Sequence, residues 1–178
     1  MGKTDRCVVR DKGYAKSGFS IRERHNERMN ETYHNADIMP DKQHLNVYYK
    51  RCEGSYADAF DAMIDAGTIT IKGQAKDGSA KVFGEMVFDV NTEYFHRNGG
   101  YEYAKSFFEE AYRCAVEEIG GEQYVISAVM HADERNKALS DSTALMCSIT
   151  TSTSFTYLSC RKNAITKRTT KTRNLPGS

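Results

Sequence analysis

The sequence has no long hydrophobic run, and this absence excludes several classes of protein. No segment approaches the roughly 18 consecutive apolar residues that a membrane-spanning helix needs. The opening segment, MGKTDRCVVRDKGYAKSG, lacks the apolar core of a secretory signal. Internal repeats are also lacking. The 178 residues, 39% hydrophobic and 28% charged, therefore predict one soluble globular domain.

The cysteines show no CxxC pair. There are five of them, an odd number at scattered spacing, namely Cys7, Cys52, Cys114, Cys147 and Cys160. In a chain without an export signal this pattern favours reduced thiols over a disulfide framework. We therefore expect a cytoplasmic protein.

The net charge of +1 hides an uneven distribution of charge. Residues 1–52 carry 11 basic and 7 acidic side chains, residues 53–140 carry 8 and 16, and residues 141–178 carry 6 and 1. The two basic ends are compatible with nucleic-acid contact, although ordinary solvated charge explains the basic front equally well.

Apolar periodicity predicts helices and strands over most of the first 131 residues. The predicted elements are a strand at Arg6–Arg10, a short helix or arm at Phe19–Asn30, a helix from Ser55 to Gly67, a strand at Ala80–Val90, a helix from about Gly100 to Gly120 and a strand at Gln123–His131. Ser55 is placed to cap its helix, and Gly120 to end the other. This order predicts an α+β fold, with helices covering one face of a central, mainly antiparallel sheet.

The composition changes abruptly after Ser140. Of the 38 residues from Asp141 to Ser178, 15 are serine or threonine and one is acidic. The stretch SITTSTSFTYLS has the β-propensity of an edge strand, whereas the rest has no apolar stripe and predicts a disordered basic arm. This composition is compatible with two alternative interpretations, a DNA-binding tail and a solvated linker.

Three polar clusters carry most of the chemistry in the sequence. They are His25-Asn26-Glu27-Arg28, Asn35-Ala36-Asp37 and His131-Ala132-Asp133-Glu134. Each cluster alone is weak evidence for a functional site, because a histidine in a charged arm is usually solvated and a histidine at a strand end is usually structural. In this order and spacing they resemble the HxxR, NxD and HxDE motifs of the Pre/Mob plasmid mobilization and recombination proteins, the MobV class of relaxases. The resemblance extends from about Cys7 to Ser140 and includes the HLN at His44–Asn46.

The resemblance implies site-specific nicking of one DNA strand at a plasmid transfer origin. His25 corresponds to the histidine that attacks the phosphodiester and forms a covalent link, which divides the transfer into two reversible steps. A neutral imidazole is nucleophilic near pH 7, and Arg28 would contact the phosphate with its guanidinium fork. Asn35 and Asp37 would support the site by holding the loop and orienting an imidazole.

The resemblance also implies a metal and a DNA partner. A divalent ion, Mn²⁺ or Mg²⁺, would polarise the scissile phosphate, and imidazole ligands favour manganese. His131 corresponds to its first ligand, and Glu134 to a catalytic acid that assists the site. The partner would be plasmid origin-of-transfer DNA, and the residues expected to bind it are Arg22, Arg24 and Arg28. A rival nucleophile is the Tyr48–Tyr49 pair, since other relaxase classes use tyrosine, but adjacent tyrosines are more often ordinary surface or core residues.

One family feature is missing from the sequence. The family has an HxH pair after HxDE, and the only histidines here are His25, His34, His44, His96 and His131. With suitable codons, a gene segment for Val-Phe-His-Tyr-His-Leu-His-Val-Val-Tyr would, read one base out of frame, encode Cys147–Thr156. We therefore interpret residues 1–140 as the front part of a relaxase domain and residues 141–178 as a frameshifted, disordered tail.

This interpretation predicts an incomplete relaxase-like sandwich. Without the HxH strand, the strand that carries His131 becomes an exposed edge, and two of three metal imidazoles are lost. We expect such a chain to lack efficient nicking. The alternatives are a remnant that only binds DNA and a non-functional, unstable fragment.

Overall fold

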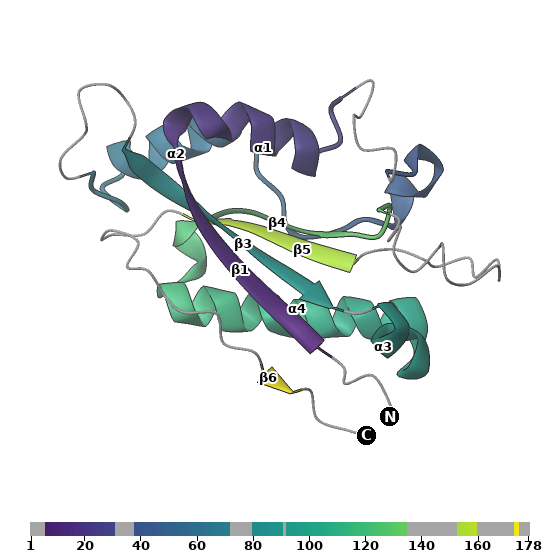
Figure 1. Ribbon diagram of the computed structural model, residues 1–178. Coiled ribbons are helices and arrows are strands. Elements are labelled where there is room, and N and C mark those ends of the chain that lie inside the picture. The colour runs from purple at the N-terminus through teal and green to yellow at the C-terminus, as the bar shows by residue number, and fades with distance from the viewer. Residues whose placement is uncertain are drawn as a thin grey trace.

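The fold of the chain is a six-stranded sheet between two layers of helices (Figure 1). A computed structural model describes residues 6–30, 38–71, 80–90, 92–134, 153–159 and 173–174. Among these residues, no helix combines the length and apolar character needed to cross a bilayer.

Every pair of neighbouring strands in the sheet is antiparallel. The strands are β1 (Arg6–Ala15), β2 (Val47–Lys50), β3 (Lys81–Val90), β4 (Val125–His131), β5 (Thr153–Ser159) and β6 (Arg173–Asn174). They lie in the order β2-β4-β5-β3-β1-β6. The predicted α+β fold with a central antiparallel sheet is confirmed.

Helices cover both faces of the sheet. The helices α1 (Phe19–Asn26) and α2 (Tyr56–Asp65) lie on one face, and α3 (Thr92–Arg97) and α4 (Gly100–Ile119) on the other (Figure 1). Three short 3-10 helices, η1 (Lys16–Gly18), η2 (Pro40–Leu45) and η3 (Glu122–Tyr124), connect these elements. The expectation that helices cover one face was wrong. Since every residue of β4 is buried, both faces of the sheet need a cover.

The ends of two helices follow the local signals in the sequence. The Ser55 hydroxyl accepts a hydrogen bond from the Asp58 N–H at 3.1 Å, which confirms the predicted cap of α2. Gly120 lies at a φ of 94°, the left-handed conformation that ends α4 after Ile119. Local signals therefore set these boundaries within a residue or two.

An aromatic cluster fixes α1 on the sheet. The Phe19 ring stacks on Phe83 of β3 with centroids 4.0 Å apart and lies 5.1 Å from the Phe60 ring of α2. All three side chains are at most 1% exposed. Burial of each large side chain contributes roughly 1.5–3 kcal/mol. The start of the helix that carries His25 is therefore firmly anchored.

Strand β5 lies in the middle of the sheet. Its backbone pairs with β3 on one side and with β4 on the other. The expectation of a disordered tail is therefore wrong for Thr153–Ser159, and the strand of His131 is not an edge. The reason is physical: β3 and β4 each present an open edge, and a segment of Thr, Phe, Tyr and Leu has the β-propensity to pair with both. Because pairing needs only backbone groups and β-forming residues, the proposed change of reading frame stays a prediction.

Candidate functional site

The end of β4 turns two polar side chains toward α1. Met130 and Ala132 belong to the cluster that packs on α4, while His131 and Asp133, which alternate with them, are 0% exposed on the opposite face. The His131 ring meets the ring of His25 from α1 edge-on, with centroids 5.3 Å apart. Two histidines from separate predicted motifs therefore come together at one place.

Arg28 ties this end of β4 to the end of α1. Its Nε donates to Asp133 Oδ2 at 2.7 Å, and its Nη2 donates to Asp133 Oδ1 at 2.6 Å. The same Nη2 donates to Glu134 Oε1 at 2.8 Å. The Arg28 side chain is only 4% exposed. A buried bidentate pair of this kind is among the stronger and more directional polar contacts in proteins.

The backbone of Arg28 has a conformation that is unusual for a side chain of its size. Its φ is 54°, in the left-handed region. The turn brings Nη1 back to donate to the carbonyl of His25 at 2.8 Å. Sparsely populated backbone conformations persist where the surrounding contacts over-determine them, commonly at functional sites. The three-residue spacing of the HxxR motif thus reflects a left-handed turn that caps its own helix.

His25 and Glu134 form the accessible part of the cluster. His25 Nε2 lies 3.4 Å from Glu134 Oε1, and the His25 side chain is 40% exposed. Burial, and then the charge of Arg28, lower the pKa of His25 below its usual 6.5. Burial raises the pKa of Glu134, although the hydrogen bond from Arg28 opposes this shift. Near neutral pH the site therefore offers a neutral imidazole beside an acid that can exchange a proton.

His131 is buried without a hydrogen-bond partner for either ring nitrogen among the described residues. Burial, followed by the charges of Arg28 and His25, holds the pKa of His131 well below 6.5, so its imidazole is neutral. Buried polar atoms without partners are rare and usually indicate an ion, a water or a catalytic role. The ligand atoms of His25, His131 and Glu134 all lie within 4.8 Å of one another, and this nitrogen and oxygen set suits a divalent transition metal.

Comparison with known proteins identifies the family. A family model described as plasmid recombination enzyme, Mob_Pre, matches residues 3–158. The chain belongs to the Mob_Pre family. The match passes Ser140, where the sequence resemblance was expected to end, and includes most of β5. No curated protein matches the chain.

Solved structures of a Mob_Pre relaxase domain share this fold. A manganese-bound crystal structure of the MobM relaxase domain with plasmid pMV158 oriT DNA, at pH 6.8, is 22% identical, covers 86% of this chain and 69% of its own, and has a TM-score of 0.65. A second MobM structure, bound to 26-nucleotide oriT DNA, is 16% identical, covers 89% of this chain and 70% of its own, and has a TM-score of 0.57. The relaxase-like architecture expected from the motifs is therefore confirmed.

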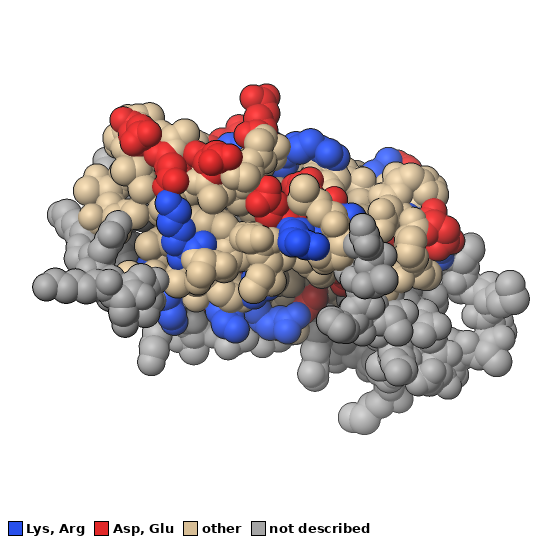
Figure 2. All heavy atoms as spheres, turned by 90° about the horizontal axis from the view of Figure 1, so that it is seen from above, with Lys and Arg blue, Asp and Glu red and all other residues tan. Residues whose placement is uncertain are grey.

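The other predicted site residues of this Mob_Pre chain differ in their surroundings. Arg24 is exposed, and its Nε donates to Asn30 Oδ1 at 2.8 Å. Arg22 lies against the Tyr14 ring, 4.2 Å from its centroid, and 3.2 Å from Glu85 Oε2. Basic and acidic side chains are interspersed on the face that α1 and α2 cover, seen from above in Figure 2. Asn35 and Asp37 lie outside the described residues.

Two residues of the cluster were not singled out from the sequence. Asp133 stands inside the HxDE motif and holds Arg28, so its position in the motif was the available signal. Asn46 belongs to the HLN segment, and its side-chain oxygen accepts a hydrogen bond from the Ala132 N–H at 2.7 Å. Asn46 thus holds the backbone between His131 and Asp133.

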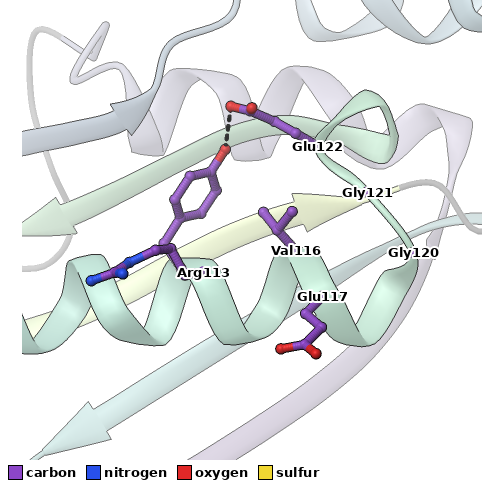
Figure 3. Close-up of a pocket in the computed structure, with 7 residues that line it drawn as sticks. Arg113, Val116, Glu117, Gly120, Gly121 and Glu122 are labelled. Carbon is purple, nitrogen blue, oxygen red and sulfur yellow. Dashed lines mark hydrogen bonds between the residues drawn. The ribbon is translucent and has the colours of Figure 1, made fainter.

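A surface pocket at the end of α4 lies apart from this cluster. Arg113, Val116 and Glu122 are among the residues around it (Figure 3). The hydroxyl of Tyr112 donates to Glu122 Oε1 at 2.7 Å, so the polar groups there are engaged with each other. None of its lining residues belongs to the histidine cluster. The pocket is therefore separate from the candidate site around His25.

Proposed function

We propose that this Mob_Pre chain binds plasmid origin-of-transfer DNA in the cytoplasm and nicks one strand through a covalent His25–DNA link. The observation that carries the proposal is a neutral, partly exposed imidazole 3.4 Å from the carboxylate of Glu134 and beside His131. The family and the oriT DNA in the similar MobM structures support the choice of substrate.

The proposed step exchanges a P–O bond for a P–N bond. The ring nitrogen of His25 that carries no proton attacks the phosphorus with its lone pair, the bond to the 3′ oxygen breaks, and that oxygen leaves and takes a proton from water. The imidazole loses its ring proton to Glu134, whose raised pKa suits it to accept and return a proton. Attack by the free 3′ hydroxyl on the phosphoramidate reverses the step and rejoins the strand.

Arg28 supports His25 from within the protein. Its side chain is 4% exposed and bound to Asp133 and Glu134, which favours a positioning and electrostatic role over the phosphate contact expected from the sequence. Its charge helps to keep His25 neutral and therefore nucleophilic. Arg22 and Arg24 are the proposed phosphate contacts of α1. Asn35 and Asp37 remain proposed supporting residues of the adjoining segment.

His131 would hold Mn²⁺ or Mg²⁺, which when bound would polarise the scissile phosphate, while Glu134 exchanges the proton of His25. If His25 attacks the DNA, the described residues leave one imidazole for the metal. The Arg28 guanidinium also lies 2.8 Å from Glu134 Oε1, and its positive charge opposes the binding of a metal cation beside this carboxylate. We therefore propose weak metal affinity and slow nicking for this chain.

Relaxation of a supercoiled plasmid that carries a Mob_Pre transfer origin tests this function. The chain should shift origin DNA in a gel without metal and relax the plasmid slowly with Mn²⁺, leaving an acid-labile adduct on the 5′ end. His25→Ala should abolish the adduct but keep the gel shift, whereas His96→Ala, an exposed histidine on α3, should change neither. Relaxation by His25→Ala at the rate of the unaltered chain would overturn the role of His25.

The second candidate function is DNA binding without nicking. The single imidazole left for a metal favours it. A gel shift with no relaxation at any Mn²⁺ concentration would support this candidate. The absence of both, together with loss of near-ultraviolet circular dichroism, would indicate an unstable fragment.

A further inference from the structure

Two adjacent tyrosines in β2 reach opposite sides of the sheet. The Tyr48 hydroxyl donates to the backbone carbonyl of Asn26 in α1 at 3.0 Å. The Tyr49 hydroxyl donates to the backbone carbonyl of Lys105 in α4 at 2.7 Å. Since successive strand residues alternate in direction, each hydroxyl reaches the helix on its own face.

The acceptor of Tyr48 is one of the carbonyls that a helix leaves without a partner at its end. The last four carbonyls of a helix have no intrahelical donor and need another one. At the end of α1, the carbonyl of His25 receives Arg28 Nη1, and the carbonyl of Asn26 receives Tyr48. Asn26 is fully buried, so a side-chain donor replaces water there.

A second tyrosine ties the same turn to α2. The Tyr56 hydroxyl donates to Glu27 Oε1 at 2.8 Å, and the Tyr56 side chain is 0% exposed. Two consecutive residues after His25 are thus held by hydroxyl groups from β2 and from α2. The side of the turn that faces β4 is held by Arg28 and Asp133.

We infer that Tyr48 is a positioning residue for His25: its hydroxyl fixes the last turn of α1 and thereby the imidazole relative to Glu134 and His131. The inference rests on the proposed function, in which His25 attacks DNA. Displacing a reacting group by about 1 Å can cost about a hundredfold in rate. A single hydroxyl that holds the backbone next to the nucleophile can therefore have a large effect on the rate of the reaction.

The same contacts argue against Tyr48 as the nucleophile. Its hydroxyl proton is donated to a backbone carbonyl, and burial raises the pKa of Tyr48 to about 12. A phenol in this state is protonated at neutral pH, and the negative charge of the neighbouring Glu27 carboxylate opposes its ionisation further. The rival nucleophile suggested by the sequence is thereby reassigned to a supporting role.

The test compares Tyr48→Phe with Tyr49→Phe. Each removes one hydroxyl that donates to a backbone carbonyl from neighbouring residues of β2, so a general loss of stability is matched. The first readout is the imidazole signal of His25 in proton NMR of the metal-free chain, assigned by its loss in His25→Ala. Tyr48→Phe should shift this signal and its titration, and Tyr49→Phe should leave both unchanged.

The second readout is nicking of origin plasmid. Tyr48→Phe should lower kcat by about ten- to a hundredfold while KM for DNA stays constant, and Tyr49→Phe should alter neither. An unshifted His25 signal in Tyr48→Phe, or an equal shift in Tyr49→Phe, would overturn the inference. Tyr56→Phe, which removes the tie at Glu27, gives an independent test if Tyr48→Phe does not fold, and should move the same signal.

The NMR arm needs no DNA and no nicking. If the unaltered chain fails to nick but Tyr48→Phe moves the His25 signal, the proposed function fails and the positioning role stands. If nicking depends on His25 but the His25 signal is the same in Tyr48→Phe as in the unaltered chain, the proposed function stands and the positioning role fails.

Discussion

At the scale of single residues, His131 links the stability of the fold to pH. Its imidazole is fully buried and neutral, with a pKa well below 6.5. In the unfolded chain the same group titrates near 6.5. Below that pH the unfolded state therefore binds a proton that the folded state does not, so stability falls as pH falls.

We expect the urea midpoint of the chain in EDTA to fall between pH 7 and pH 5.5. His131 contributes up to about 1.4 kcal/mol per pH unit in this window. His25, with its lowered pKa, acts in the same direction, whereas the raised pKa of Glu134 opposes both. His131→Gln should flatten the dependence on pH. An identical slope for His131→Gln and the unaltered chain would contradict the assignment.

Among the residues of the site, Arg28 is the one whose removal should lower the free energy of unfolding the most. Arg28→Ala leaves the carboxylate of Asp133 buried without its partner, which typically destabilises a protein by about 3–5 kcal/mol. Arg24→Ala, at an exposed position of the preceding helix α1, should lower the free energy of unfolding by no more than about 0.5 kcal/mol. Urea denaturation at pH 7 measures both. Equal losses for the two variants would show that the Arg28–Asp133 pair is not formed.

At the scale of elements, β5 decides whether the sheet is continuous. It fills the space between β3 and β4, which otherwise expose two apolar edges. Its residues are rich in threonine and serine, yet its backbone pairs with β3 along the whole strand and with β4 from Ser154 to Ser159. The stability of β5 therefore depends on its pairing with β3 and β4, which are distant in sequence.

Proline in the middle of β5 should prevent folding. Thr156 pairs with Val87 of β3 and with Val129 of β4, and proline there removes a ladder hydrogen bond and clashes with the central sheet. Thr156→Val keeps the backbone donor and should retain the fold. Circular dichroism and urea denaturation separate the two outcomes. A Thr156→Pro chain as stable as the unaltered one would show that β5 is not in the sheet.

At the scale of the whole molecule, strand register places one β5 residue beside His131, the proposed metal ligand. Ser154 pairs with His131, and directly opposed residues of antiparallel strands share a face. A histidine introduced at position 154 would thus lie on the face of His131 and Glu134. The neighbouring position, Thr153, would present a histidine to the other face.

Ser154→His should therefore strengthen metal binding. At a Mn²⁺ concentration about a hundredfold above Kd, binding adds about 2.7 kcal/mol, which for a domain of this size raises Tm by on the order of 5–10 °C. Thr153→His is the matched control and should respond to Mn²⁺ no more than the unaltered chain. An equal rise in Tm for both variants would contradict the register of β5 beside β4.

Much of the fold and site followed from local signals in the sequence. Ser55 caps α2 because its side chain accepts a hydrogen bond from a backbone N–H of the first turn. Gly120 ends α4 because it adopts the left-handed conformation. The motif spacing likewise selected His25 and His131 as site residues, and the structure brings their rings together. The helix ends depend on a few neighbouring residues, and the motifs on short spacings that resemble those of a known family, so the sequence alone indicated them.

Only the tertiary structure decided the contacts between distant segments. The pairing of Arg28 with Asp133, the helices on both sheet faces and the central place of β5 all join residues far apart in the chain. The same holds for Tyr48, whose hydroxyl has the same chemistry as that of Tyr49 but reaches the turn next to His25. Composition and periodicity carry no information on which partner a buried polar group meets, because that choice depends on strand register and on how the helices pack across the sheet.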